Sequence, residues 1–407
     1  MLQVKTYSAC ALISVLVACG SPAEQPPTSA GGGANAGSAG KANGAGGAQG
    51  GAGGSGGSLG GAAPAVAGMG GAGGPSAGAG GSAGAPALVV CGPPADPFAP
   101  ITKLSQTGCV DPAHPTQPSA SALRYEVNSP LWSDSADKGR AMVVPAGAKV
   151  HVADDGHWDF PVGSVFIKTF AFDAKLVETR LFMRVSQSDW VGYSYQWDEA
   201  QTEATLVSPD GADASFNTGK QQVSWHYPSH DDCLNCHNAA AGSTIGPETA
   251  QMNRTVGNMN QIDALAARGL FENAPAKPYK AALVTPYTSQ AGAASGTTEQ
   301  KARSYLHANC GFCHRPGGNY PNFDFRNDTA FKDMGLCNAE AKKGALSSAP
   351  GKTKILVPGQ AMSSVMWLRM NEPDPTKGRM PQIASYAVDH AALDVVGNWI
   401  NAIPPCP

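Results

Sequence analysis

The sequence predicts a multidomain chain, with a β-sandwich-like domain followed by an α-helical region and preceded by a disordered Gly/Ala-rich linker. Glycine, alanine and serine dominate residues 20–88, where charge is almost absent. Short runs of aromatic and β-branched residues between turn signals occupy residues 120–228, and apolar residues recur at helical spacing beyond them. The expected segments are residues 1–19, 20–88, 89–228, 229–295 and 296–407.

The first segment, residues 1–19, has the features of an export signal. Lys5 provides a positive charge, and the apolar run from Ala9 to Ala18 is too short to span a bilayer. The run ends in a Leu-Val-Ala-Cys tetrad that resembles a bacterial lipobox, which implies cleavage before Cys19 and a lipid on its sulfur. Gly20 then favours the outer membrane of a Gram-negative cell. We expect an exported protein, anchored by lipid on the periplasmic or surface face. The alternative is an ordinary secretory signal with an incidental cysteine.

Residues 20–88 contain most of the chain's 50 glycines and predict a flexible tether. This composition cannot bury a hydrophobic core, and about 70 Gly-rich residues span about 45 Å as a random coil. A collagen helix is excluded because glycine keeps no period of three. The tether would therefore position the folded part without contributing chemistry.

Residues 89–228 predict antiparallel β structure of the sandwich kind. Turn signals such as Pro145-Ala146-Gly147 and Asp154-Asp155-Gly156 separate the apolar runs. The expected strands are Ala141–Pro145, Lys149–Ala153, Ser164–Phe172, Val177–Val185 and Val191–Trp197.

Five tryptophans in this region could form a platform for a sugar. Packing in the core or between strands is the favoured role, because large aromatic side chains mostly pack. The five are Trp132, Trp158, Trp190, Trp197 and Trp225.

The charge pattern gives no sign of nucleic-acid binding. The net charge is −3, and the chain contains no basic run with interleaved aromatic residues. After the export signal, no apolar stretch is long enough to cross a membrane. We therefore expect no nucleic-acid partner, and membrane contact only through the lipid on Cys19.

The strongest chemical signal is a pair of C-x-x-C-H motifs. In such a motif, two cysteines on one helical turn form thioethers with the vinyl groups of a porphyrin, and the histidine coordinates the iron. Two copies in a chain with an export signal predict covalently bound haem c, with two groups expected and one as the minimum. The residues are Cys233, Cys236 and His237 in the first copy and Cys310, Cys313 and His314 in the second.

Two other uses of paired cysteines are less favoured. Cys-x-x-Cys pairs can form a zinc site with four cysteines, but zinc does not require a histidine directly after each pair, and exported thiols tend to oxidise. A thioredoxin-type redox motif would need a βαβ context, which the sequence does not show.

The segment of the first motif, residues 229–295, is short for a self-sufficient haem domain. We therefore expect the first haem to pack against a neighbouring domain. A helix is predicted at Asn260–Leu270 and is ended by Pro275 and Pro278. The sixth ligand of the first iron stays open, and an unfilled position that binds a small molecule is one alternative. The side chains considered for this ligand are Met252, Met259, His226 and His230.

The second motif lies at the end of a predicted helix. Thr297 and Gln300 form a capping-box pattern at the start of this helix. Arg315–Gly318 breaks the chain away from the helix after the motif. A backbone carbonyl in this break, for example that of Pro316, would accept the second ring N–H of His314 and orient the imidazole.

Met380 is the expected sixth ligand of the second iron. It precedes a proline in the loop Lys377–Pro381, and its neutral thioether would favour ferrous iron and raise the potential. Met362, Met366 and Met370 are rivals, but their i, i+4, i+8 spacing puts them on one helix face and indicates packing.

The chain ends in a predicted amphipathic helix. Asp389 can cap its start, and four apolar side chains at helical spacing form one stripe. The stripe consists of Leu393, Val396, Trp399 and Ile400.

Four cysteines remain once Cys10, Cys19 and the motif cysteines are set aside. An even number in an exported chain indicates two disulfides. Sequence proximity favours one bond between the first two and one between the last two, while three pairings are formally open. The four are Cys91, Cys109, Cys337 and Cys406.

Residues 296–407 resemble a class I cytochrome c, with a helix, a C-x-x-C-H motif, loops, a Met-Pro segment and a closing amphipathic helix. The resemblance implies covalent haem at Cys310 and Cys313 and packing of the first helix on the last. It also implies that His314 and Met380 are the axial ligands.

Most of residues 90–407 is similar to an uncharacterised family of exported bacterial proteins, in which a β-rich domain precedes C-x-x-C-H motifs. The similarity lies in Tyr125–Asp134, in Trp225–Pro228 and in Asn260-Gln261. This resemblance implies a domain order but no established activity.

These features predict an envelope-tethered, di-haem c-type cytochrome that transfers electrons to and from redox partner proteins of the cell envelope. An electron carrier is favoured over an enzyme. The first alternative is a haem-dependent oxidoreductase with an open first haem. The second is a glycan- or envelope-binding module with an accessory cytochrome domain.

Overall fold

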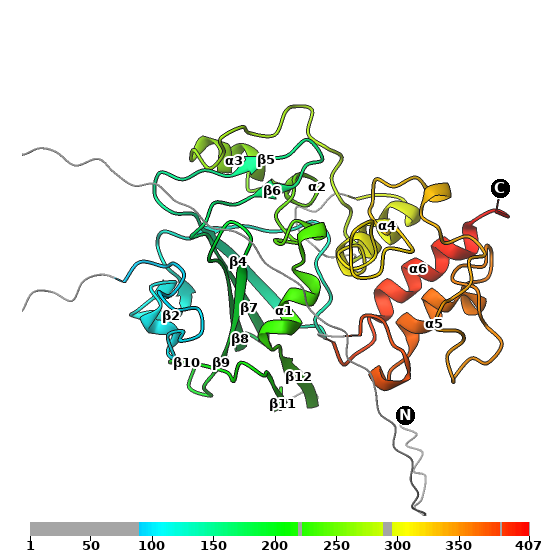
Figure 1. Ribbon diagram of the computed structural model, residues 1–407, viewed down its shortest axis with the longest axis horizontal. Helices are drawn as coiled ribbons and strands as arrows, with labels where there is room; N and C mark the ends of the chain where they lie inside the picture. Colours follow the sequence, from blue (N-terminus) through cyan, green and yellow to red (C-terminus); the bar gives the residue numbers. More distant parts are fainter. Residues whose placement is uncertain (1–88, 219–221, 288–294, 383–384, 407) are drawn as a thin grey trace, which may run out of the picture. The chain divides into compact units, whose positions relative to one another are not determined.

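The computed structural model describes residues 89–218, 222–287, 295–382 and 385–406. The predicted export signal at residues 1–19, with Cys19, and the predicted tether at residues 20–88 lie outside the described residues. All described residues belong to one compact unit. In this unit a β-rich part is followed by a helical part (Figure 1). This is the order of β structure and helices that the sequence predicts.

One antiparallel sheet of six strands is the centre of the β-rich part (Figure 1). The strand order is β10-β9-β8-β7-β4-β3, so β7, β8 and β9 form a continuous meander. The bounds are β3 Leu123–Arg124, β4 Asp137–Val143, β7 Val165–Phe172, β8 Lys175–Arg184, β9 Trp190–Trp197 and β10 Ala204–Leu206.

The predicted strands are confirmed best where the apolar runs are longest. The runs at Ser164–Phe172, Val177–Val185 and Val191–Trp197 correspond to β7, β8 and β9. The run at Ala141–Pro145 is only the end of β4, which begins earlier, at Asp137. Of the run at Lys149–Ala153, two residues form β5.

The remaining strands pair two by two. The pairs are β1 with β2, β5 with β6, β11 with β12, and β13 with β14, all antiparallel. Their bounds are β1 Val110–Asp111, β2 His114–Pro118, β5 His151–Val152, β6 Trp158–Asp159, β11 Ala212–Asn217, β12 Gln222–Tyr227, β13 Thr255–Val256 and β14 Met259–Asn260.

Side chains alternate between the two faces of the six-stranded sheet along each strand, and each face is buried against another part of the chain. On one face, Ile167 and Leu181 pack with the N-terminal segment that contains Leu104 in the helical turn η1 (Leu104–Gln106). On the other face, Phe166 and Phe182 pack with residues of β6 and α3 (Gln261–Ala267). The second face also receives the first motif.

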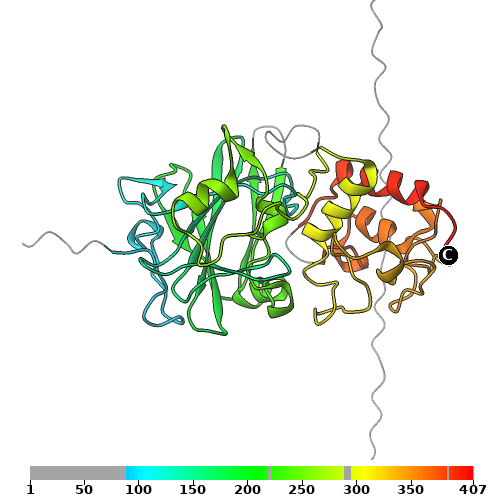
Figure 2. The ribbon, with the colours of Figure 1, turned by 90° about the horizontal axis from the view of Figure 1, so that it is seen from above.

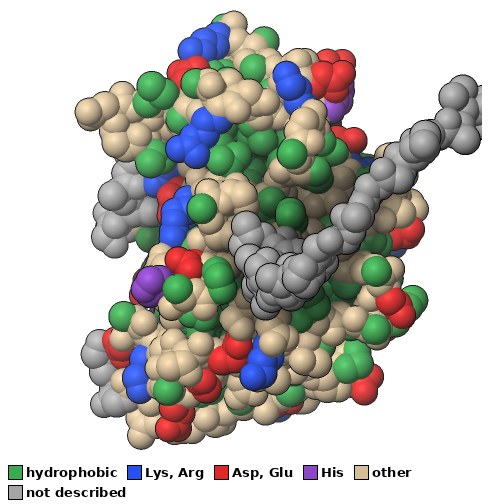
Figure 3. Space-filling model, turned by 90° about the vertical axis from the view of Figure 1, so that its left-hand side faces the viewer, with side chains coloured by type: hydrophobic (Ala, Val, Ile, Leu, Met, Phe, Trp, Pro, Cys, Tyr) green, Lys and Arg blue, Asp and Glu red, His purple; other side chains and the backbone are tan. Residues whose placement is uncertain are grey.

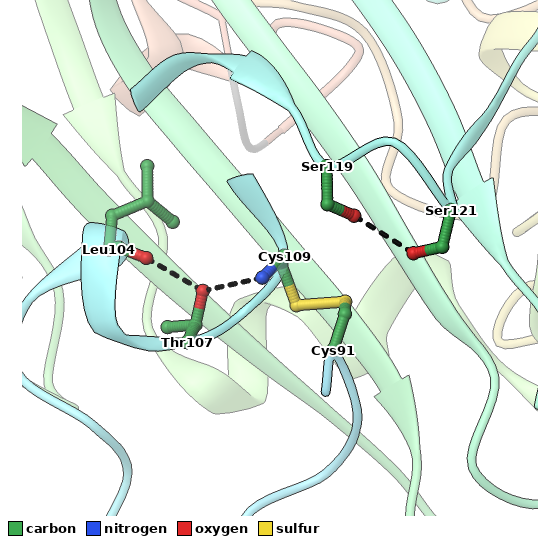
Figure 4. The surroundings of a disulfide bond; sticks show 6 residues. All are labelled: Cys91, Leu104, Thr107, Cys109, Ser119 and Ser121. Atoms are coloured by element: carbon green, nitrogen blue, oxygen red, sulfur yellow. Dashed lines mark hydrogen bonds between the residues drawn. A yellow bond between two sulfur atoms is a disulfide. The ribbon is translucent and has the colours of Figure 1, made fainter. Parts of the chain in front are cut away.

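Two disulfides close the ends of the folded chain. Cys91 and Cys109 are joined beside the sheet, with Cα atoms 4.4 Å apart (Figure 4). The hydroxyl of Thr107 accepts a hydrogen bond from the Cys109 N–H at 3.2 Å and so fixes the turn before the bond. Cys337 and Cys406 are joined with Cα atoms 6.0 Å apart. The structure therefore has the pairing that sequence proximity favours.

Three short helices and one helical turn follow the sheet. They are α1 His230–Cys236, η2 Ala239–Ala241, α2 Thr249–Met252 and α3 Gln261–Ala267. The predicted helix at Asn260–Leu270 is present, but it ends earlier than the sequence pattern suggests. Asn260 caps α3 by accepting from the Ile262 N–H, and Gly269 at φ +74° turns the chain away before Pro275 and Pro278 are reached. Glycine adopts this left-handed conformation at little cost.

The helical part consists of α4 Thr298–Asn309, α5 Val365–Asn371 and α6 His390–Ala402, with the helical turns η3 Phe331–Asp333, η4 Ala361–Ser363 and η5 Pro375–Lys377. Thr297 and Gln300 form the predicted capping box of α4, and Asp389 caps α6. The buried residues of α4 and α6 share one hydrophobic core, so the first and last helices of this part pack together (Figure 2). All four residues of the predicted α6 stripe are buried.

The tryptophans of the β-rich part pack as the sequence favours. Trp158, Trp190, Trp197 and Trp225 are each at most 7% exposed, and Trp132, partly buried, donates its indole N–H to the Ala387 carbonyl at 2.9 Å. On the face of the molecule that Figure 3 shows, acidic and basic side chains are interspersed rather than gathered by sign.

Candidate functional site

The first C-x-x-C-H motif is held by the short helix α1. Ser229 caps the helix and forms a capping box with Asp232: the Asp232 N–H donates to the Ser229 hydroxyl at 3.0 Å, and the Asp232 carboxylate accepts from the Ser229 N–H at 3.0 Å. Cys233 and Cys236 lie one turn apart on this helix, and the N–H of His237 donates to the Cys233 carbonyl at 2.9 Å. The two thiols and the imidazole are therefore presented from one rigid turn.

The imidazole of His237 is oriented by the chain that follows it. Its Nδ1 lies 2.6 Å from the Ser243 carbonyl, and a carbonyl only accepts, so Nδ1 carries the proton. Nε2 is then left with a lone pair, and it has no hydrogen-bond partner among the described residues. Burial lowers the pKa of His237 to about 4. A neutral ring with one nitrogen anchored to a backbone carbonyl is the arrangement that a metal-binding histidine needs.

Helix α1 packs directly on strand β9, where Gly192 makes room for it. A Cβ atom at Gly192 would lie 2.6 Å from the sulfur of Cys233. The ring of Phe182, on β8, lies 4.1 Å from the ring of His237, measured between centroids. The first motif is therefore packed against the sheet, while the predicted packing of its haem stays a prediction.

A cavity that is partly open to solvent lies between α1 and the sheet. Cys233, Cys236 and His237 all line it. Phe166 and Phe182 contribute apolar wall from the sheet. A wide, largely apolar space beside two thiols and a neutral imidazole has the character of a cofactor pocket.

The second motif begins at the residue that caps the C-terminal end of α4. The N–H of His314 donates to the Cys310 carbonyl at 2.9 Å, as the corresponding group does in the first motif. The Nδ1 atom of His314 is buried without a hydrogen-bond partner in the described chain, so the expected bond to the Pro316 carbonyl does not form. Burial lowers the pKa of His314, and the Tyr320 backbone partly opposes this shift. The chain turns away before Pro316 can approach the ring, because Gly318 already bonds back to Arg315.

A second cavity, also partly open to solvent, lies beside His314 and Cys310. Three methionines line it, Met366, Met370 and Met380. Met366 and Met370 lie on α5 and belong to, or pack against, the core shared by α4 and α6, whereas Met380 lies in a loop outside that core.

The expectation that Met362 shares a helix face with Met366 and Met370 is wrong. Met362 lies in the helical turn η4 before α5 and is 74% exposed. Ser364, which separates the two elements, has extended backbone and breaks the predicted periodicity.

The loop that carries Met380 is fixed from several sides. The Met380 N–H donates to the Arg369 carbonyl at 2.9 Å. The neighbouring Arg379 is 1% exposed and donates to the Ser385 hydroxyl at 2.9 Å and to the Pro373 carbonyl at 3.2 Å. These bonds hold the thioether of Met380 at the wall that it shares with His314.

All four motif cysteines are free thiols. Burial raises the pKa of Cys233 to about 11 and those of Cys236 and Cys310 to about 12, and it also raises the pKa of Cys313. Zinc binding and thiol–disulfide exchange both use the thiolate, which these surroundings disfavour.

The two motifs, far apart in the sequence, contact each other directly. Asn238, just after the first motif, donates to the Phe312 carbonyl inside the second at 3.0 Å. The Asn235 carbonyl accepts from the Asn319 amide at 2.8 Å and lies 3.7 Å from the sulfur of Cys313. Cys236, Cys310 and Cys313 line one further cavity, of about 860 Å³, between the segments.

No family model, curated protein or solved structure matches this chain. The site is therefore interpreted from its own geometry. Within the described residues, no three or more His, Cys, Asp or Glu side chains are grouped as the ligands of a metal ion. No helix among the described residues is long and apolar enough to cross a membrane.

The residues present fit covalently bound haem at both motifs. A haem iron takes only one or two protein ligands, and the histidine and two free thiols of each motif line one cavity. Of the four side chains considered as sixth ligand of the first iron, only His226 lines the first cavity, and both of its ring nitrogens are near carboxylates, Asp213 at 2.8 Å and Asp232 at 3.2 Å. Met252 is fully buried elsewhere, and Met259 is 52% exposed.

The sequence predicts the candidate ligands but not the residues that support them. No recognisable motif contains Ser243, Gly192 or Asn238. Gly192 and Asn238 contact residues that are distant in the sequence, and Ser243 reaches His237 only because the chain turns between them. A glycine in the middle of an aromatic strand was the one available signal, because such a glycine often marks a close approach of another segment.

Proposed function

We propose that this chain is a di-haem c-type cytochrome that transfers electrons at the cell envelope. One observation carries the proposal: two C-x-x-C-H segments from distant parts of the sequence contact each other, and the histidine and both cysteines of each segment line a cavity. Bound haem would supply reversible one-electron exchange between ferric and ferrous iron.

The residues of the chain would divide the work of holding the two groups. Cys233 and Cys236 would form the thioethers of the first haem, with His237 as its axial ligand. The Ser243 carbonyl would accept a hydrogen bond from the Nδ1–H group of His237 and so leave the Nε2 atom available to coordinate iron.

At the second site, Cys310 and Cys313 would form the thioethers, with His314 and Met380 as axial ligands. Met366 and Met370 are occupied in packing, which leaves Met380 as the thioether on a fixed loop. A thioether ligand favours the ferrous state relative to a second histidine.

The finer assignments belong to the same proposal. Residues 296–407 would form a class I cytochrome c domain, and residues 89–228 a β-sandwich-like domain. A lipid on Cys19 would attach the chain to the outer membrane, and the tether would allow redox partner proteins of the envelope to approach. The packing of α4 on α6 supports the first of these assignments.

One observation favours a second candidate function, a haem-dependent oxidoreductase. No methionine is among the described residues that line the first cavity, and the two ring nitrogens of His226 are directed at Asp213 and Asp232. An iron held by His237 alone would keep one position open for a small ligand such as peroxide or carbon monoxide.

The test of the main proposal is a count of haem per chain. The mature protein, produced with cytochrome maturation machinery, should contain two haems by alkaline pyridine spectroscopy and show the matching increase in intact mass. The variant Cys233→Ala/Cys236→Ala and the variant Cys310→Ala/Cys313→Ala should each contain one. A colourless protein of unmodified mass would exclude the proposal.

Carbon monoxide separates the two candidate functions. If both irons are six-coordinate, the Soret band of the reduced protein should not change on addition of carbon monoxide. If the first iron is open, the band should shift, and the shift should disappear in the Cys233→Ala/Cys236→Ala variant.

A further inference from the structure

The sheet face beneath α1 carries three positively charged side chains in one row. Arg140 on β4 is paired with Lys168 on β7, and Lys168 is paired with Arg180 on β8. Residues that are paired across strands point to the same face with Cβ atoms about 5 Å apart, and like charges in such positions destabilise a sheet. We call these three residues the cation row.

The charges of the cation row are poorly compensated by the protein. The side chain of Lys168 has no hydrogen bond or ion pair within the described chain, and its ammonium lies 5.1 Å from the centre of the Phe170 ring. Burial lowers its pKa far below the ordinary value, and Arg140 and Arg180 add to the shift, so the ammonium form is disfavoured in the absence of an anion. The side chain of Arg140 is 9% exposed, and its ion-pair partner Glu126 is 3.9 Å away and half exposed. Such a distant, solvated pair contributes little.

Only Arg180 has a close buried partner. Its guanidinium donates two hydrogen bonds to the fully buried carboxylate of Glu178, at 2.7 Å and 2.8 Å. Arg140 and Lys168 therefore have no close, buried counterion among the described residues. Burying unpaired charges is costly, so the row points to an anion that the polypeptide does not supply.

The cation row lies on the wall of the first cavity, together with the first motif. Arg140, Lys168 and Arg180 line the same space as Cys236 and His237. The one carboxylate on this wall, Asp232, is engaged by Ser229 and His226.

We propose that the cation row binds the two propionate carboxylates of the haem attached at Cys233 and Cys236. This inference rests on the proposed function and deepens it, because it assigns the orientation of the first haem to the β-rich part. Two carboxylates match the two side chains that lack a close counterion, and guanidinium and ammonium groups form their strongest hydrogen bonds with such anions.

The propionate assignment makes an unusual prediction about stability. Lys168→Met keeps the length of the side chain and removes its charge. In haem-free protein this change removes the cost of placing an amine between Arg140 and Arg180 without a counterion, so the melting temperature should rise. In haem-loaded protein it removes a partner of a carboxylate, so the melting temperature should fall. A residue with a purely packing role would shift both in one direction.

The experiment compares the full chain, expressed with and without cytochrome maturation machinery, in three forms. These are the unchanged protein, Lys168→Met, and the control Lys175→Met, which alters an exposed lysine at the start of β8. Lys175→Met should leave both melting temperatures unchanged. Lys168→Arg, which keeps the charge, should restore the melting temperature of the haem-loaded form.

A potentiometric titration of the haem-loaded forms provides a second readout that does not depend on haem-free protein. In Lys168→Met, and also in Arg140→Gln, the potential of one haem should fall, because the freed propionate charge stabilises ferric iron. The other potential should stay constant.

The outcomes are distinguishable. Two haems per chain with unchanged potentials and parallel melting shifts in Lys168→Met would overturn the propionate assignment and leave the proposed function intact. If succinate raised the melting temperature of the haem-loaded protein but not of Lys168→Met, the row would be open to a free anion, and the assignment would also be overturned. Absence of haem from the unchanged protein would remove both proposals.

Discussion

Gly192 is the residue at which the β-rich part and the first motif come closest. An added Cβ atom would lie 2.6 Å from the sulfur of Cys233 and 3.0 Å from its Cβ. Because such contacts are too short to be tolerated, Gly192→Ala should push α1 off the sheet and displace the thiols from the cavity. The haem content of the mature protein should fall from two toward one per chain.

The control for this change is Gly92→Ala, since nothing lies within 4 Å of a Cβ atom at Gly92. It should keep both haems. Full haem content in Gly192→Ala, with unchanged melting temperature, would mean that α1 can move aside without loss.

Met380 allows a matched test of the second site. Met380→Ala removes the thioether on the wall shared with His314, so the second iron should become five-coordinate and bind carbon monoxide. The measurement is the Soret shift of the reduced protein in the Cys233→Ala/Cys236→Ala background, where only the second haem remains. Met362→Ala, at a methionine that is 74% exposed, should show no shift. If Met366→Ala binds carbon monoxide and Met380→Ala does not, the sixth ligand is Met366 on α5.

The elements that carry the motifs depend on their caps. Helix α1 has only seven residues, and such a short helix is marginal without capping or packing. Ser229→Ala removes the hydroxyl that accepts from the Asp232 N–H and donates to its carboxylate. Loss of an N-cap costs about 1 kcal/mol. Ser229→Ala should therefore lower the yield of haem at the first motif only.

Thr297→Ala is the mirror-image control, because Thr297 caps α4 with the same capping box. It should affect the second motif and spare the first, as measured by haem content in the corresponding single-motif backgrounds. Equal effects of both changes on both motifs would show that the caps act on global stability and not on their own helix.

The elements also show what sequence patterns can predict. Strands β7 to β9 were predictable because their runs of aromatic and β-branched side chains are long and bounded by turns. The hairpin β11–β12 was not, because Ala212–Asn217 mixes small and polar residues and pairs only through its partner strand. Helix α3 ends at a glycine rather than at the prolines, since either residue type can end a helix and the first one reached decides.

The sequence predicts which residues are the candidate ligands of the site, but it does not predict the residues that surround them. Cysteines and histidine at fixed spacing are local, so the motifs were visible in the sequence. The cation row joins Arg140, Lys168 and Arg180 from three strands, and only the register of the sheet aligns them. No local pattern contains that information.

At the scale of the whole molecule, Glu248 and His307 join the segments of the two motifs. His307 donates from Nε2 to the Glu248 carboxylate at 2.7 Å, and its Nδ1 accepts from the Asn327 N–H at 3.1 Å. Burial alone would raise the pKa of Glu248, but the interaction with His307 outweighs it and the pKa lies below the ordinary 4.5. A lowered carboxyl pKa stabilises the folded state above the unfolded pKa, and this stability is lost as the pH falls through the folded value.

Glu248→Gln should therefore lower the free energy of unfolding by about 1.5–3 kcal/mol near pH 7, the range for a hydrogen bond to a charged group. The deficit should shrink as the pH falls below 4.5, because the unchanged protein then loses the same contribution. Denaturant unfolding at several pH values measures both. Glu199→Gln, at an exposed position, should show no pH-dependent difference from the unchanged protein. A deficit in Glu248→Gln that is constant across this pH range would contradict the linkage.

The contact between the motifs has its clearest consequence for electron movement. Because Asn238 and Asn319 bridge the two segments directly, electrons should redistribute between the sites inside one chain rather than by collision of two chains. After rapid reduction by a substoichiometric donor, the exchange phase seen at a wavelength that separates the two haems should keep its rate constant over a tenfold dilution. The Cys233→Ala/Cys236→Ala variant should lack this phase entirely. A rate constant that falls in proportion to protein concentration would mean that the two motifs exchange electrons only between molecules, and the adjacency of the segments would then serve folding alone.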